Sequence, residues 1–187
     1  MATPDATITT LYDVPVSNNG ARARMILYYK KVPQDEVNIL SPQQLGGLKS
    51  DAFTKLNPHG LMPLLVTPEG VPIPESDTIS RYLCARFAER GPRLVPAEPL
   101  AAAKMERICR LHDIYMVSIQ QAMYKAVGPD VYPPFGKFAT RRAALDELVK
   151  QLVTLEEYAA ESDGPYLCGS EPTAADCAVF PTACFWM

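Results

Sequence analysis

The chain has 187 residues, of which 48% are hydrophobic and 21% charged, and this is the composition of a folded globular protein of one domain or two small ones. Its formal net charge of -3 offers no basic excess for binding phosphates, which argues against a nucleic acid as the partner. No stretch approaches the roughly 20 apolar residues of a membrane-spanning helix, and the first residues do not resemble a secretory signal.

The cysteines indicate a reducing compartment. There are five, an odd number, and no two have the Cys-x-x-Cys spacing that a structural zinc site uses. The chain has only two histidines, which makes a histidine-based metal site a poor fit. We therefore expect a cytoplasmic protein without a disulfide framework and without a metal.

The first forty residues alternate between strand and helix patterns. Residues 8–13 are β-branched and aromatic, and residues 36–40 alternate between polar and apolar side chains, so both favour strands. Between them, residues 21–31 repeat apolar positions at helical spacing and end in basic side chains. The order strand, helix, strand predicts a parallel pair joined by a crossover.

The next fifty residues predict a hairpin and a second helix. Residues 41–55 are polar and irregular, with one helical turn near their end. Residues 62–67 and 71–73 are apolar and flank a Pro-Glu-Gly turn, which predicts two strands in a hairpin. Residues 76–90 have apolar side chains at helical spacing and begin with Ser76, a residue type that caps helices.

A proline-rich segment, residues 91–99, separates this mixed pattern from a purely helical one. We therefore expect two domains. The first, residues 1–90, has the order βαβ-ββα and belongs to the α/β class. The second, residues 91–187, is all-α.

The helical part contains three predicted helices. Residues 100–126 and 138–162 each carry an apolar stripe, and the proline-rich residues 128–136 break the chain between them. A third helix opens at Thr173, where the spacing to Asp176 is that of a capping box. After that point the chain has almost no polar face, which predicts a helix in the interior that is either cut short or covered by a partner.

Three places could carry chemistry. Ser17 follows the first strand and precedes the first helix, so its hydroxyl can cap the helix or donate to an anion at the helix end. Pro63 opens a strand, and a cis bond there would leave the preceding backbone groups free to pair with a peptide-like ligand. Glu75 and Ser76 stand at a helix start, where they could hold the head group of an α-amino acid.

These places fall within motifs that resemble a known family. Residues 57–65 read N-P-H-G-L-M-P-L-L, residues 75–83 read E-S-D-T-I-S-R-Y-L, and residues 164–176 read G-P-Y-L-C-G-S-E-P-T-A-A-D. In this order they resemble the cytosolic glutathione transferases of the serine type (phi-, tau-, zeta- or delta-like), with the class not assigned. The resemblance implies a thioredoxin-like first domain and an all-helical second domain that is shortened at its C-terminus.

The resemblance implies roles for individual residues. Ser17 lies where serine-type members keep the hydroxyl that activates the glutathione thiol. Tyr12 is the alternative donor, because other classes use a tyrosine at the end of the first strand, but its spacing fits less well.

Five further positions correspond to the family's glutathione-binding residues. Met62, before Pro63, would pair through its backbone with the cysteinyl part of glutathione. Glu75 and Ser76 would hold the γ-glutamyl end, and Lys49 the glycine carboxylate.

The resemblance implies that the protein conjugates the glutathione thiolate to hydrophobic electrophiles, a detoxification reaction. Because family members are usually homodimers, it also implies a homodimer. Glutathione is then the co-substrate and a hydrophobic electrophilic small molecule the second partner, with no nucleic acid or membrane. Two alternatives stay open. Leu48 and Leu61 depart from the family pattern and favour a non-catalytic ligand carrier or interaction protein. A glutathione-dependent isomerase is the third hypothesis.

Overall fold

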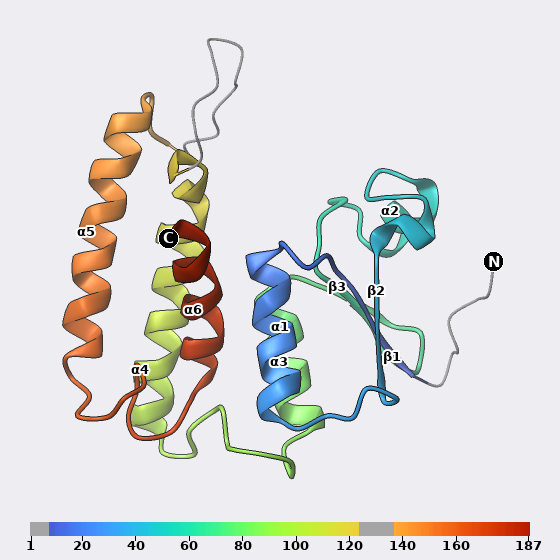
Figure 1. Ribbon diagram of the computed structural model, residues 1–187, viewed down its shortest axis with the longest axis horizontal. Helices are drawn as coiled ribbons and strands as arrows, with labels where there is room; N and C mark the ends of the chain where they lie inside the picture. The colour runs from blue at the N-terminus through green and yellow to red at the C-terminus, as the bar shows by residue number, and fades with distance from the viewer. Residues whose placement is uncertain (1–7, 124–136) are drawn as a thin grey trace. The chain divides into compact units, whose positions relative to one another are not determined.

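The computed structural model describes residues 8–123 and 137–187. By internal contacts the chain divides into two compact units, one ending at Leu94 and the other beginning at Val95 (Figure 1). The first holds a sheet with helices and the second is helical, which confirms the predicted fold class.

The first unit is built on a four-stranded mixed sheet with the strand order β2-β1-β3-β4. The parallel pair is β1 (Thr9–Tyr12) with β2 (Val37–Leu40), as the crossover pattern predicted. Strands β3 (Leu64–Val66) and β4 (Pro72–Pro74) form the predicted hairpin, and β3 runs antiparallel to β1.

Helices α1 (Asn18–Tyr29) and α3 (Ser76–Arg86) contact each other and lie side by side (Figure 1). The short helix α2 (Asp51–Leu56), which follows the 3-10 turn η1 (Pro42–Leu45), supplies Phe53 to a separate core cluster beside the sheet. In that cluster Phe53 packs against Tyr12 and Leu64, which are opposite each other in the sheet. Because strand side chains alternate between faces, the fully buried neighbours of Tyr12 and Leu64 point to the other face. These neighbours are Leu11 and Leu65.

The end of α1 differs from the prediction. The helix stops at Tyr29, and Lys30 caps it instead of lying in its last turn. The buried Lys30 ammonium donates to the carbonyl of Pro92 at 2.9 Å. Gly91 has a φ of 55°, and a Cβ there would lie 2.0 Å from the carbonyl oxygen of Tyr29. The start of the proline-rich segment is therefore fixed to the first unit.

The second unit begins with α4 (Pro99–Arg110), which continues without a break into η2 (Leu111–Met116) and η3 (Val117–Met123). The predicted helix 100–126 is thus present over its described part, but it changes from α to π and then to 3-10 winding. Its last residues and the predicted break at 128–136 lie outside the described residues. The described residues 137–187 form α5 (Arg141–Ala159) and α6 (Ala174–Trp186).

Helix α6 packs against α4 through a shared core. Met105, Ile108 and Cys109 of α4 meet the small side chains of the first turns of α6. Past that core, the buried His112 ring lies 2.8 Å from the hydroxyl of Thr182, which links η2 to α6. The prediction of an interior helix is correct for residues 174–179, whereas Phe180 is 59% exposed.

The capping box at the start of α6 is confirmed. The Asp176 carboxylate accepts from the backbone N–H of Thr173 at 2.7 Å and from its hydroxyl at 2.9 Å. It also accepts from the backbone N–H of Leu167 at 2.9 Å, which ties the preceding loop to the helix. One buried carboxylate therefore satisfies three donors.

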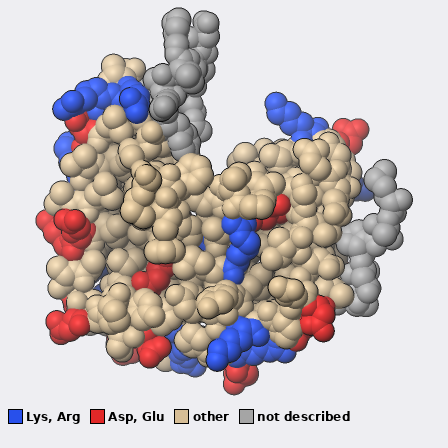
Figure 2. Space-filling model, viewed as in Figure 1, with Lys and Arg blue, Asp and Glu red and all other residues tan. Residues whose placement is uncertain are grey.

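On the face shown in Figure 2, cationic and anionic side chains are interspersed. Within residues 8–123 and 137–187, no helix is both long and apolar enough to cross a membrane.

Candidate functional site

Strand register brings the predicted site residues to one edge of the sheet. Tyr12, the last residue of β1, pairs with Leu64 at the start of β3, which in turn pairs with Pro74 at the end of β4. The segments that follow Tyr12, precede Leu64 and follow Pro74 must therefore leave the sheet at the same edge. These segments carry Ser17, Met62 with Pro63, and Glu75 with Ser76.

Ser17 caps α1. Its side-chain oxygen accepts from the backbone N–H of Gly20 at 3.0 Å, and its own backbone N–H donates to the carbonyl of Val14 at 3.0 Å. The residue is partly exposed, and its hydroxyl donates to no other residue in the described part of the chain. The hydroxyl proton is therefore available to a ligand at the positive end of the helix.

The Met62–Pro63 peptide bond is cis. Neither backbone group of Met62 is hydrogen-bonded to another residue among those that the structure describes. The buried Asn57 holds the preceding turn: its side chain donates to the carbonyl of Leu61 at 2.7 Å and accepts from the N–H of His59 at 3.1 Å. A fixed turn thus presents an unpaired backbone segment at the start of β3, a site for strand-like pairing with a peptide.

Glu75 and Ser76 form the start of α3, but not as predicted. The cap is Glu75, which makes no side-chain capping bond, and Ser76 is the first helical residue. Glu75 is exposed and has a φ of 70°, a conformation that costs free energy in a residue with a side chain. Such strained conformations concentrate at functional positions. Here the conformation places the Glu75 carboxylate beside the N-terminus of α3.

Lys49 lies in the turn between η1 and α2, and its side chain is exposed. This turn closely approaches the 57–61 turn, since a Cβ on Gly60 would be 2.9 Å from the carbonyl oxygen of Leu48. Lys49 is therefore carried on a segment packed against the one that leads to Met62.

Tyr12, the alternative donor, is buried in the core cluster with Phe53, and the two rings meet edge to face at 6.4 Å. Burial raises the pKa of its phenol above the ordinary value. These contacts are those of a core side chain, whereas Ser17 is partly exposed.

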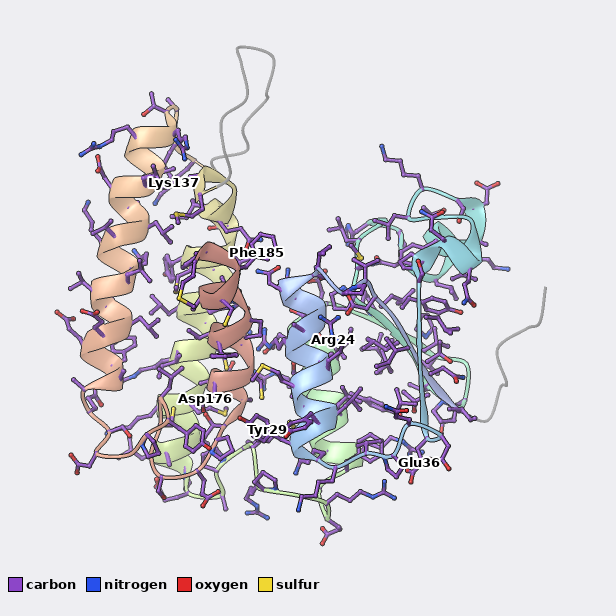
Figure 3. The ribbon with its side chains drawn as sticks, viewed as in Figure 1. Arg24, Tyr29, Glu36, Lys137, Asp176 and Phe185 are labelled. Atoms are coloured by element: carbon purple, nitrogen blue, oxygen red, sulfur yellow. The ribbon has the colours of Figure 1, made fainter. Side chains whose placement is uncertain are left out.

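Two charged pairs at the site were missed from the sequence. Arg22, almost fully buried on α1, contacts the Asp77 carboxylate at 2.8 Å and so links α1 to the first turn of α3. Arg24 on α1 (Figure 3) forms an ion pair with Asp13, which follows β1. The sequence around Arg22 and Arg24 did not reveal these pairs, because their acidic partners lie outside α1.

The helical unit contains a separate cavity of about 280 Å³. Its lining is mainly apolar and consists of Ile114, Tyr115, Ser118, Ile119, Lys137, Phe138 and Glu147. A lining of this kind suits a small hydrophobic molecule.

A βαβ-ββα domain with a cis-proline before its third strand, followed by helices, defines a thioredoxin-like domain joined to an all-α domain. The family model for the N-terminal domain of glutathione S-transferases matches residues 11–91, and the model for their C-terminal domain matches residues 138–186. The chain belongs to the glutathione S-transferase family, whose members use glutathione as a substrate.

Individual proteins resemble the chain over most or part of its length. The chain is 30% identical over 172 residues to "Glutathione S-transferase 3" of Zea mays, covering 89% of this chain and 72% of the relative. It is 33% identical over 129 residues to "Probable elongation factor 1-gamma 2" of Arabidopsis thaliana, covering 68% of this chain and 29% of that protein. Among solved structures, poplar glutathione transferase F1 aligns with a TM-score of 0.76 at 22% identity, over 96% of this chain and 81% of that one, which shows the fold.

Proposed function

We propose that this protein conjugates glutathione to hydrophobic electrophiles, with Ser17 as the residue that stabilises the thiolate. The observation that carries the proposal is the position of Ser17: a partly exposed hydroxyl at a helix N-terminus, whose proton has no acceptor in the described part of the chain. The same edge of the sheet carries the unpaired backbone of Met62 and the first residues of α3.

The proposed reaction needs an ionised thiol. A free thiol with a pKa of about 8.5 is mostly protonated at neutral pH, and the thiolate is the nucleophile. A charge-assisted hydrogen bond from Ser17 contributes about 1.5–3 kcal/mol, and the helix end about 0.3–1 kcal/mol. Since one pKa unit corresponds to about 1.4 kcal/mol, these two terms together lower the pKa of the bound thiol by about one to three units, of which Ser17 supplies the larger part.

The thiol proton leaves to solvent, and Ser17 keeps its own proton because a serine hydroxyl is too weak an acid to lose it. The sulfur lone pair then forms a carbon–sulfur bond with the electrophile, and the leaving group departs with the electron pair of the broken bond. The rest of the rate enhancement comes from holding the sulfur next to the electrophile.

The remaining residues bind the tripeptide. The backbone of Met62, before Pro63, pairs with the cysteinyl unit as an added strand would. Glu75 attracts the γ-glutamyl ammonium, and the α3 N-terminus at Ser76 the γ-glutamyl carboxylate. Lys49 attracts the glycine carboxylate. We further propose a cytoplasmic homodimer that acts in detoxification.

Retention on immobilised glutathione followed by turnover of a chlorodinitrobenzene acceptor tests the activity. Binding with turnover is the expected result. Binding without turnover would indicate the ligand-carrier alternative, and turnover of a maleyl-type substrate alone would indicate the isomerase. The absence of both binding and turnover would contradict the proposal.

Glu75→Gly is expected to separate stability from binding. Glycine adopts positive φ without strain, so the free energy of unfolding should stay unchanged or rise by about 1 kcal/mol. Loss of the carboxylate should weaken glutathione binding about tenfold, the scale of one charge-assisted hydrogen bond. Glu75→Gln is the control, because it removes the charge and keeps the strain. Wild-type glutathione affinity in both variants, measured by calorimetry, would exclude the assigned role.

A further inference from the structure

Arg24 holds the loop that joins β1 to α1. Its guanidinium donates to the carbonyls of Val14 at 3.2 Å and Pro15 at 3.0 Å, and its Nη2 lies 3.5 Å from the carbonyl of Ser17. The same guanidinium forms an ion pair with Asp13. A planar fork with five N–H donors can serve such a set of acceptors, which a lysine ammonium cannot match.

The carboxylate of this ion pair is shielded from water, whereas the guanidinium is partly exposed. The side chain of Asp13 is 0% exposed and that of Arg24 is 27% exposed. Burial lowers the pKa of Arg24 from its ordinary value, although a guanidinium remains charged at neutral pH. The Asp13 carboxylate is pressed against Gly20, where a Cβ would overlap it. The countercharge of this buried carboxylate therefore comes from the helix that Ser17 caps.

We propose that Arg24, anchored by Asp13, is a positioning residue that fixes the direction of the Ser17 hydroxyl. The inference rests on the proposed function of Ser17. The backbone of Ser17 is tied to the loop by its N–H bond to Val14, and Arg24 binds the carbonyl oxygens of that loop. Without the Arg24 guanidinium the loop can rotate, and the proton of the Ser17 hydroxyl no longer points at a fixed sulfur position.

Arg24→Met in the wild-type and Ser17→Ala backgrounds tests whether Arg24 acts through Ser17. The readout is the pKa of the bound glutathione thiol, followed by the ultraviolet absorbance of its thiolate, together with the pH profile of kcat/KM. In the wild-type background we expect the pKa to rise and kcat/KM at neutral pH to fall about tenfold, as for a misplaced catalytic group. In the Ser17→Ala background we expect the same substitution to cause no further change.

Equal shifts in both backgrounds would overturn the proposal, because Arg24 would then act by its charge or by general stability. An unchanged pKa in both would also overturn it. Arg24→Lys covers the case in which Arg24→Met does not fold: it keeps a charge for Asp13 without the fork, and a partial shift is expected. Glu75 and the Arg22–Asp77 pair, the charged groups at the neighbouring helix starts, stay constant in every variant. A wild-type protein that binds no glutathione would refute the proposed function itself.

The matched control for this experiment is Arg142→Met. It makes the same chemical change at a side chain that is 86% exposed on α5 and paired with Asp146 one helical turn away. This variant should keep the wild-type thiol pKa and pH profile.

Discussion

Replacing Ser17 with alanine is expected to lower kcat/KM about 10- to 100-fold at neutral pH and to raise the pKa of the bound thiol by about one to two units. The physical reason is that alanine cannot donate to the thiolate. Because the pKa rises, the pH–rate profile moves to higher pH, and the activity recovers as the thiol ionises without help.

Two matched variants show whether the effect of Ser17→Ala comes from the loss of the hydroxyl. Ser17→Thr keeps a hydroxyl at the helix cap and should retain most of the activity. Tyr12→Phe removes the buried phenolic oxygen and should leave the thiol pKa unchanged. Full activity in Ser17→Ala together with loss of activity in Tyr12→Phe would move the catalytic role to Tyr12.

The second large effect is expected in the helical unit. Asp176→Ala should lower the free energy of unfolding of the protein by about 3 kcal/mol or more, since each buried donor left unsatisfied costs about 1–3 kcal/mol. The carboxylate of Asp176 (Figure 3) serves two groups of Thr173 and the backbone N–H of Leu167. Denaturant unfolding followed by circular dichroism measures the loss.

Asp163→Ala is the control for this measurement. Asp163 lies in the same loop region but is exposed, so its removal should change the stability by less than about 0.5 kcal/mol. Asp176→Asn retains one acceptor oxygen and should fall between alanine and wild type. Equal stabilities of Asp176→Ala and Asp163→Ala would show that the capping box does not stabilise the fold.

Local patterns predicted the elements of the first unit because each element is short and bounded by strong turn residues. The parallel β1–β2 pair and the β3–β4 hairpin followed from the crossover and from the Pro-Glu-Gly turn. The end of α1 was placed too late because the capping role of Lys30 depends on a buried contact with Pro92, far away in the chain. The change to π and 3-10 winding after Arg110 could likewise not be predicted, because the apolar side chains form one continuous stripe along this part of the sequence.

The candidate site was predictable in part. The motifs located Ser17, Pro63 and Glu75, and strand register explains why they share an edge. Ser76 was expected to cap α3, and only the backbone shows that Glu75 takes that position with a positive φ.

The Arg24–Asp13 pair could not be predicted, because it joins a helix to the end of a strand. Charge patterns within one element reveal i, i+4 partners and not partners that the fold brings together.

We propose that Ser17, Met62 and the start of α3 form one site that binds glutathione with its sulfur ionised. Calorimetric titration of the full chain at neutral pH, in buffers of different ionisation enthalpy, measures both the binding and the protons released. We predict that glutathione binds and releases a substantial fraction of a proton, whereas S-methylglutathione binds without releasing one. No heat from either ligand, or equal proton release from both, would contradict the claim.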